Sequence, residues 1–170
     1  MLDRLMERFR APGAYRSAPT YSPGATINDA RDEARRRGDR KIGTEHLLLA
    51  LLHDPASAQA LGCALETGRQ ALDALDRAAL GAVGMSAVPE APPVPGQEHA
   101  RLPLTPAAKA VLIGAMKERA RARLGPEHVL LALLLRERPD PAAELLAALG
   151  VDRAVVRQRL TRDALAGETR

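Results

Sequence analysis

The sequence predicts an all-α protein of about eight helices, arranged as two tandem, pseudo-twofold-related four-helix units. Composition is the first reason: 46% of the 170 residues are hydrophobic but only 2% are aromatic, so leucine and alanine must form the core. Such a composition favours helices over a sandwich or a barrel, which depend on β-branched and aromatic residues. An internal repeat is the second reason, because it divides the chain into two similar halves.

The repeat is clearest in two blocks that share the pattern Gly-x-Glu-His before a run of aliphatic residues. These blocks are residues 41–52 and 123–134, so Glu45 and Glu127 occupy matching positions. Both blocks lead through Asp-Pro into an alanine-rich stretch that ends in Leu-Gly. An amphipathic pattern then closes each unit, at Leu72, Leu75 and Leu80 in the first and at Val151, Val155, Val156 and Leu160 in the second.

Proline and glycine mark the expected boundaries between these parts. The chain should divide into an N-terminal segment and tether, a first unit, a proline-rich linker, a second unit and a polar tail. The corresponding ranges are 1–19, 20–80, 81–103, 104–163 and 164–170.

The N-terminal segment carries its own amphipathic pattern. Leu2, Leu5, Met6 and Phe9 fall on one stripe of a short helix. We expect this stripe to pack on the core of the chain, with attachment to a membrane surface as the alternative.

Local signals place helix starts within each unit. Thr44 is the expected N-cap of the first leucine-rich helix, and Glu45 in its first turn faces the positive end of the helix dipole. Pro126 takes the place of that threonine in the second unit, where a first-turn N–H has no helical partner to lose. Thr105 is expected to cap the opening helix of the second unit. The leucines after Glu45 and Glu127 lie on every side of their helices, which predicts two paired, buried central helices.

Charge and cysteine content exclude several classes of protein. The net charge is +4, and the arginine runs at 35–37 and 119–123 have acidic residues nearby, which is typical of solvated helix faces. The single cysteine, Cys63, excludes an internal disulfide and fits a small core residue in a reducing compartment. No apolar run reaches the roughly 18 residues of a membrane span, and the first ten residues lack the apolar centre of a signal peptide. We therefore expect a cytoplasmic protein.

The sequence offers little for catalysis or metal binding. His46 and His128 each follow a glutamate, and His53 lies further along, but none has the spacing of a zinc site. We interpret them as buried or hydrogen-bonded histidines. No Gly-x-Ser-x-Gly motif and no phosphate-binding Gly-x-x-x-x-Gly-Lys-Ser/Thr loop occurs. The prediction is a protein without catalytic residues, bound metal or cofactor.

The duplicated motifs resemble those of a known family. Gly-Thr-Glu-His-Leu-Leu-Leu at residues 43–49, Leu-Thr-Pro-Ala-Ala-Lys-Ala-Val-Leu at 104–112 and the terminal Leu-Gly of each unit resemble the N-terminal repeat domain of Clp (Hsp100) unfoldases, nearest to the ClpC branch. The resemblance covers residues 20–163. It implies two pseudo-twofold-related four-helix units that receive substrates and adaptor proteins for a hexameric ATPase and its protease. In the absence of an ATPase motif, the expectation is a free-standing receptor domain.

The resemblance to the ClpC branch also implies recognition of phosphorylated arginine. There the glutamate of each Gly-Thr-Glu-His motif contacts the guanidinium, and nearby helix starts hold the phosphate. Carried to this sequence, the candidate ligand-binding residues are Glu127, Thr105, Lys109, Glu45 and Thr44. Thr105, Lys109 and Glu127 are expected to form the better site, because Pro23 and Gly24 should shorten the opening helix of the first unit.

Two other interpretations remain open at this point. Both glutamates can act simply as favourable charges at helix starts. A basic helical regulatory protein that binds nucleic acid is the alternative function, although no aromatic stacking platform accompanies the arginines.

Overall fold

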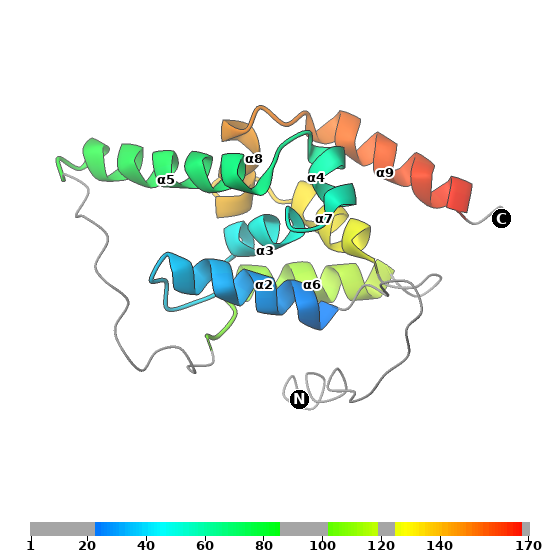
Figure 1. Ribbon diagram of the computed structural model, residues 1–170, viewed down its shortest axis with the longest axis horizontal. Helices are drawn as coiled ribbons and strands as arrows, with labels where there is room; N and C mark the ends of the chain where they lie inside the picture. Colours follow the sequence, from blue (N-terminus) through cyan, green and yellow to red (C-terminus); the bar gives the residue numbers. More distant parts are fainter. Residues whose placement is uncertain (1–22, 86–101, 119–124, 168–170) are drawn as a thin grey trace.

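The computed structural model describes residues 23–85, 102–118 and 125–167, which form eight helices (Figure 1). The first four are α2 (Pro23–Arg36), α3 (Thr44–Leu51), α4 (Pro55–Leu61) and α5 (Leu65–Ala82). The second four are α6 (Pro106–Glu118), α7 (Pro126–Leu134), α8 (Pro141–Ala148) and α9 (Arg153–Gly167). Within the described ranges the only β-type pairing is an isolated parallel bridge between Ile42 and Leu104. The all-α prediction is confirmed.

The two units are interlocked rather than placed end to end. Each unit opens with a helical pair, α2 against α3 and α6 against α7. The third helix of each unit then packs on the other unit: α8 lies against α3 and α5, and α4 lies against α7 and α9 (Figure 1). The packing of α8 on α3 and α5 thus has its counterpart in the packing of α4 on α7 and α9. This correspondence is the predicted pseudo-twofold relationship.

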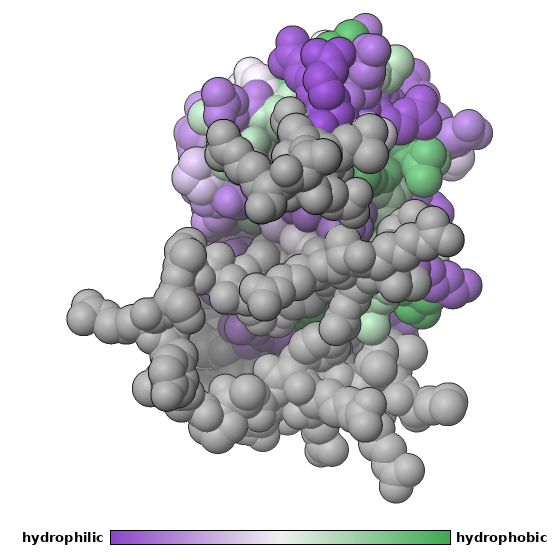
Figure 2. All heavy atoms as spheres, turned by 90° about the vertical axis from the view of Figure 1, so that its right-hand side faces the viewer, coloured by the Kyte–Doolittle hydropathy of each residue, from purple (hydrophilic) through white to green (hydrophobic). Residues whose placement is uncertain are grey.

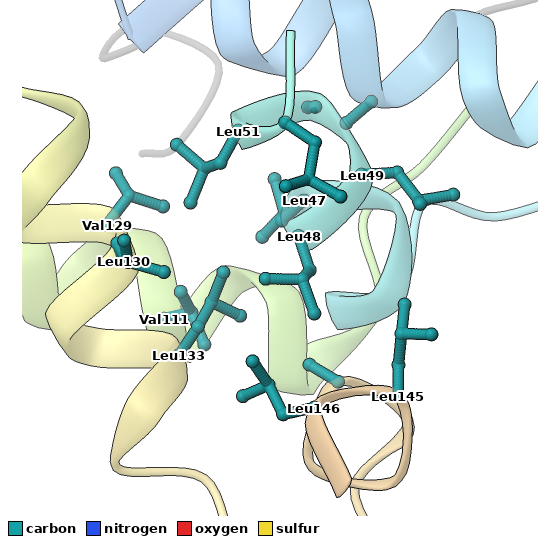
Figure 3. Packing of buried hydrophobic residues seen from close by; sticks show 14 of the residues in the cluster. Leu47, Leu48, Leu49, Leu51, Val111, Val129, Leu130, Leu133, Leu145 and Leu146 are labelled. Carbon is teal, nitrogen blue, oxygen red and sulfur yellow. The ribbon is translucent and has the colours of Figure 1, made fainter. Parts of the chain in front are cut away.

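The central helices α3 and α7 contact each other and supply much of the core. On α3, all residues but Glu45 are buried, because apolar residues occupy every side of the helix after its first turn. Figure 3 shows leucines of α3 meeting residues of α6, α7 and α8. Each fully buried leucine contributes about 1.5–3 kcal/mol of transfer free energy. The labelled core residues are Leu47, Leu48, Leu49, Leu51, Val111, Val129, Leu130, Leu133, Leu145 and Leu146.

The opening helix of the first unit is not shortened, and that prediction is wrong. Helix α2 begins at Pro23 and runs for 14 residues, compared with 13 for α6, which begins at Pro106. Proline fits the first helical position because its missing N–H would have no helical partner there. Gly24 lies in the same first turn and is tolerated at a cost of about 1 kcal/mol relative to alanine.

The ends of the chain show two further differences. Helix α9 continues to Gly167, so the predicted polar tail begins inside a helix. The predicted N-terminal stripe from Leu2 to Phe9 lies outside the described residues. No described helix is long and apolar enough to cross a membrane. Figure 2 shows the face at the right-hand side of Figure 1. The described residues on this face are mainly hydrophilic, with small apolar patches between them.

A buried carboxylate, which the sequence analysis missed, joins three elements of the first unit. Glu33 of α2 has a side chain that is only 2% exposed and accepts hydrogen bonds from Arg69 of α5 and Arg36, at 3.0 Å and 3.2 Å. His53, just after α3, lies 2.9 Å from the other Glu33 oxygen. Burial opposes ionisation of Glu33, but hydrogen bonds from Arg69, His53 and Arg36 outweigh it and lower its pKa to about 2.

Candidate binding sites at the starts of the central helices

The two motif glutamates fold back over the starts of their own helices. Helices α3 and α7 have Gly43 and Gly125 as N-caps, one residue before the first helical residue. A Cβ at Gly43 would lie 2.2 Å and 2.3 Å from the carboxylate oxygens of Glu45, and one at Gly125 would lie 2.1 Å from both oxygens of Glu127. A larger residue at either position would therefore displace the carboxylate, which occupies the space of a Cβ.

The histidine of each motif completes the cap. The backbone N–H of Gly43 donates to Nδ1 of His46 at 3.0 Å, and Gly125 donates to Nδ1 of His128 at 3.1 Å. Nε2 of His46 lies 3.0 Å from a carboxylate oxygen of Asp39. Burial opposes charge on His46, but Asp39 and Glu45 outweigh it and raise the pKa of the imidazole. The prediction of buried, hydrogen-bonded histidines is confirmed for His46, which is 1% exposed.

Glu45 has fewer hydrogen-bond donors than its burial requires. Its Oε1 lies 3.1 Å from Nδ1 of His46, but that nitrogen accepts the N–H of Gly43 and has no proton to offer while the ring is neutral. Its Oε2 is buried and has no hydrogen-bond partner among the described residues. A carboxylate accepts hydrogen bonds only, so this site favours a cationic donor such as a guanidinium.

Glu127 has the same local geometry with more access to solvent. Its Oε1 lies 3.1 Å from Nδ1 of His128, but the Glu127 side chain is 38% exposed, compared with 17% for Glu45. Of the two related carboxylates, Glu45 is therefore the one with less contact with water.

Thr44 is not the N-cap, and that prediction is wrong. It is the first residue of α3 and is 1% exposed. Its hydroxyl donates to Oδ1 of Asp140 at 2.7 Å and accepts the backbone N–H of Ala142 at 3.3 Å. Asp140 is itself the N-cap of α8. In the structure, Thr44 thus joins α3 to the second unit.

Thr105 caps α6 as predicted, by accepting the backbone N–H of Ala108 at 3.2 Å. The backbone N–H of Thr105 donates to the carbonyl of Ile42 at 2.9 Å, just before α3. The start of α6 therefore lies beside the start of α3, while the length of α6, about 20 Å, separates it from the start of α7 (Figure 1).

The grouping of Thr105 and Lys109 with Glu127 is consequently wrong. The parallel pairing of Leu104 with Ile42 places the first turn of α6 next to the first unit, so Thr105 belongs with Glu45. Lys109, in that first turn, is exposed. The sequence did signal that both units begin with a helix, because Ser22-Pro23 matches Thr105-Pro106.

The described residues show neither a metal-binding group nor a thiol with raised reactivity. No group of three His, Cys, Asp or Glu side chains in the described ranges could hold a metal ion. Cys63 is partly buried against the core, and burial raises the pKa of its thiol, which disfavours the reactive thiolate.

The fold and these paired helix starts define an all-α domain made by duplication of one helical unit. Residues 20–123 match the family model described as the Clp repeat (R) N-terminal domain, so the chain belongs to the Clp repeat N-terminal domain family. The N-terminal domain of the caseinolytic protease associated chaperone ClpD from Arabidopsis thaliana has a similar fold, with a TM-score of 0.62 at 20% identity. That similarity covers 82% of this chain and 92% of the ClpD domain.

Curated relatives confirm the resemblance to ClpC. The chain is 34% identical over 140 residues to the negative regulator of genetic competence ClpC/MecB of Bacillus subtilis. It is 31% identical over 148 residues to the chaperone protein ClpC2, chloroplastic, of Oryza sativa subsp. japonica. These matches include 77% and 82% of this chain but only 15% and 14% of the relatives.

Proposed function

We propose that this chain is a non-enzymatic module that binds substrate proteins or adaptors in cytoplasmic protein quality control. It would deliver them to a Clp ATPase and its protease, or sequester them. Membership in the Clp repeat N-terminal domain family supports the general role. The two motif glutamates support the binding of a cationic group.

Phosphoarginine on a marked protein is the ligand we propose for the first site. The observation that carries this proposal is the Glu45 carboxylate. It is largely buried, its Oε2 lacks a partner among the described residues, and it lies at the start of α3, beside which α6 also begins. A guanidinium supplies the missing donors. The positive end of the α6 dipole and Lys109 provide favourable charge for the phosphate.

The sequence predicts that phosphoarginine prefers the site at Glu127, and the proposal reverses this preference in favour of Glu45. Thr105 and Lys109 lie at the start of α6, beside the start of α3 and its Glu45. Phosphoarginine should therefore bind more tightly at the first site than at Glu127. Calorimetric titration of the full chain with phosphoarginine tests this. Glu45→Gln should lower the affinity about tenfold or more, because a hydrogen bond to a charged group contributes about 1.5–3 kcal/mol.

Glu127→Gln is the matched control because it removes the same group from the same position of the related helix. It should change the affinity less than Glu45→Gln. Equal losses in the two variants would refute the asymmetry, and unchanged binding in both would place the ligand elsewhere.

The structure favours this function over nucleic-acid binding. Arg36 pairs with Glu33, and Arg37 bonds to Asp73 at 2.8 Å and to Asp76, so these arginines are already neutralised. The second arginine run, 119–123, lies outside the described residues. Binding to DNA that weakens steeply with added salt would contradict the proposal.

A further inference from the structure

A hollow of about 290 Å³ lies between α4, α7 and α9, at the start of α7, where Glu127 lies in the first turn. Alanine and leucine side chains form its apolar part, and two carboxylate residues contribute to its lining. The described residues that line it are Asp54, Ala56, Ser57, Ala60, Pro126, Glu127 and Leu160.

At the pseudo-twofold counterpart of this hollow, a buried leucine stands where the hollow has an alanine. Helices α4 and α8 both begin at the proline of an Asp-Pro pair, which aligns Ala60 with Leu146. Leu146 is fully buried, whereas the alanine leaves space beside Leu160. Thr44 reaches Asp140 across the first interface, but Pro126 at the matching place has no hydroxyl to donate to Asp54. The two interfaces therefore differ at two matching positions, Ala60 against Leu146 and Pro126 against Thr44.

We propose that this hollow binds an unmodified arginine or lysine side chain of a polypeptide. Ala60 and Leu160 suit the aliphatic stem. Glu127 and Asp54, whose Oδ2 also caps α4 by accepting hydrogen bonds from Ser57, supply negative charge for the cationic head. The volume lies at the low end of ligand pockets and matches a single side chain rather than a folded partner.

The chemistry differs from that of the Glu45 site. Asp54 and Glu127 both repel a phosphate, and none of the described lining residues is basic. The second unit thus selects the unmodified basic side chain, while the first site is the one proposed for phosphoarginine. The two proposals rest on different residues and can fail independently.

Amide NMR of the full chain tests this proposal with three peptides of one sequence, Ala-Leu-X-Ala-Leu, blocked at both ends. X is arginine, its neutral isostere citrulline, or phosphoarginine. The arginine peptide should shift the amides of Ala56, Ser57 and Ala60 in a saturable manner. The citrulline and phosphoarginine peptides should leave these amides unshifted.

Two variants locate the arginine peptide. Ala60→Leu introduces the leucine found at the matching position 146 and should abolish the shifts. Glu127→Gln should weaken binding about tenfold, because it removes one charge-assisted hydrogen bond from a half-exposed side chain. Glu66→Gln, which alters a 67% exposed carboxylate outside the hollow, is the control and should leave the affinity unchanged. The proposal is overturned by shifts confined to α3 and α6, by equal binding of the citrulline peptide, or by the absence of any shift.

Discussion

The hydroxyl of Thr44 lies 2.7 Å from Oδ1 of Asp140 and joins the first residue of α3 to the N-cap of α8. Both groups are buried, and the backbone N–H of Ala142 is shared between them, at 3.3 Å from Thr44 and 3.1 Å from Asp140. This small network closes the interface between the units on the side where α8 packs on α3.

Thr44→Val should therefore destabilise the fold by about 1–3 kcal/mol, because it leaves the buried Asp140 oxygen without its hydroxyl donor. Urea denaturation measures the change. Thr161→Val is the control: the Thr161 hydroxyl bonds to the carbonyl of Arg157 on the exposed surface, so its loss should change the free energy of unfolding by less than about 0.5 kcal/mol. Similar values for the two variants would contradict the assigned role of Thr44.

Glu33 should make the protein acid-sensitive within a defined range. Its folded-state pKa of about 2 lies below its ordinary value of 4.5. The charged form stabilises the fold fully above pH 4.5, and this contribution is lost as the pH falls towards 2. The shift corresponds to about 3 kcal/mol.

Glu33→Gln should remove most of that contribution at neutral pH and flatten the fall in stability between pH 4.5 and 2. Chemical denaturation at a series of pH values measures both effects. Glu66→Gln, which alters a 67% exposed partner of Arg69, is the matched control and should leave the pH profile unchanged. A Glu33→Gln profile parallel to wild type would contradict the pKa assignment.

Gly43→Ala should displace the Glu45 carboxylate without removing its charge. The new Cβ would lie 2.2 Å from a carboxylate oxygen at the end of a flexible side chain, and the Gly43 φ of −94° suits alanine. Phosphoarginine affinity should fall about tenfold or more, as for Glu45→Gln, while the free energy of unfolding changes by at most about 1 kcal/mol.

Titration calorimetry and thermal denaturation of this variant separate the two effects. Gly114→Ala lies inside α6, where a Cβ meets no atom within 4 Å. This control should stabilise the helix by about 0.5–1 kcal/mol and leave binding unchanged. Normal phosphoarginine affinity in Gly43→Ala would show that the position of the carboxylate does not matter.

Gly68→Ala should destabilise the fold by about 1–3 kcal/mol through overpacking. A Cβ there would lie 2.7 Å from Leu52 Cδ1 and 3.0 Å from Leu49 Cδ2, which pushes α5 away from the leucines of α3. Gly81→Ala, on the same helix with no atom within 4 Å of its Cβ, is the control and should be neutral or stabilising. Thermal denaturation of both variants gives the comparison, and equal midpoints would refute the close approach at Gly68.

The fold class and the central helices could be predicted from the sequence because they depend on local pattern. The leucines around α3 and α7 leave no polar face, and the repeated Gly-x-Glu-His motif marks both helix starts. Capping propensity alone favours threonine over glycine, so the sequence predicts the cap at Thr44. In the structure Gly43 has the extended backbone of the N-cap, and Thr44 is already the first helical residue.

The composition of the candidate site could not be predicted, because it depends on contacts between distant segments. Thr105 follows the linker and was grouped with Glu127 of its own unit. The bridge from Leu104 to Ile42 places it with the other unit. Glu33 was overlooked for a related reason: its partners Arg69 and His53 converge on it only after α2, α3 and α5 have packed together.

The exchange of third helices makes each half of the chain structurally incomplete. A lone unit would leave the surfaces of its second and fourth helices uncovered, since α8 covers α3 and α5, and α4 covers α7 and α9. A single-copy ancestor with this architecture would have required a second identical chain, related by a twofold axis with the same patch on both partners. Fusion of two gene copies then makes that association permanent and frees each half to diverge. In this view, the hollow beside Glu127 is a site that a strictly symmetric dimer would have to carry twice or not at all.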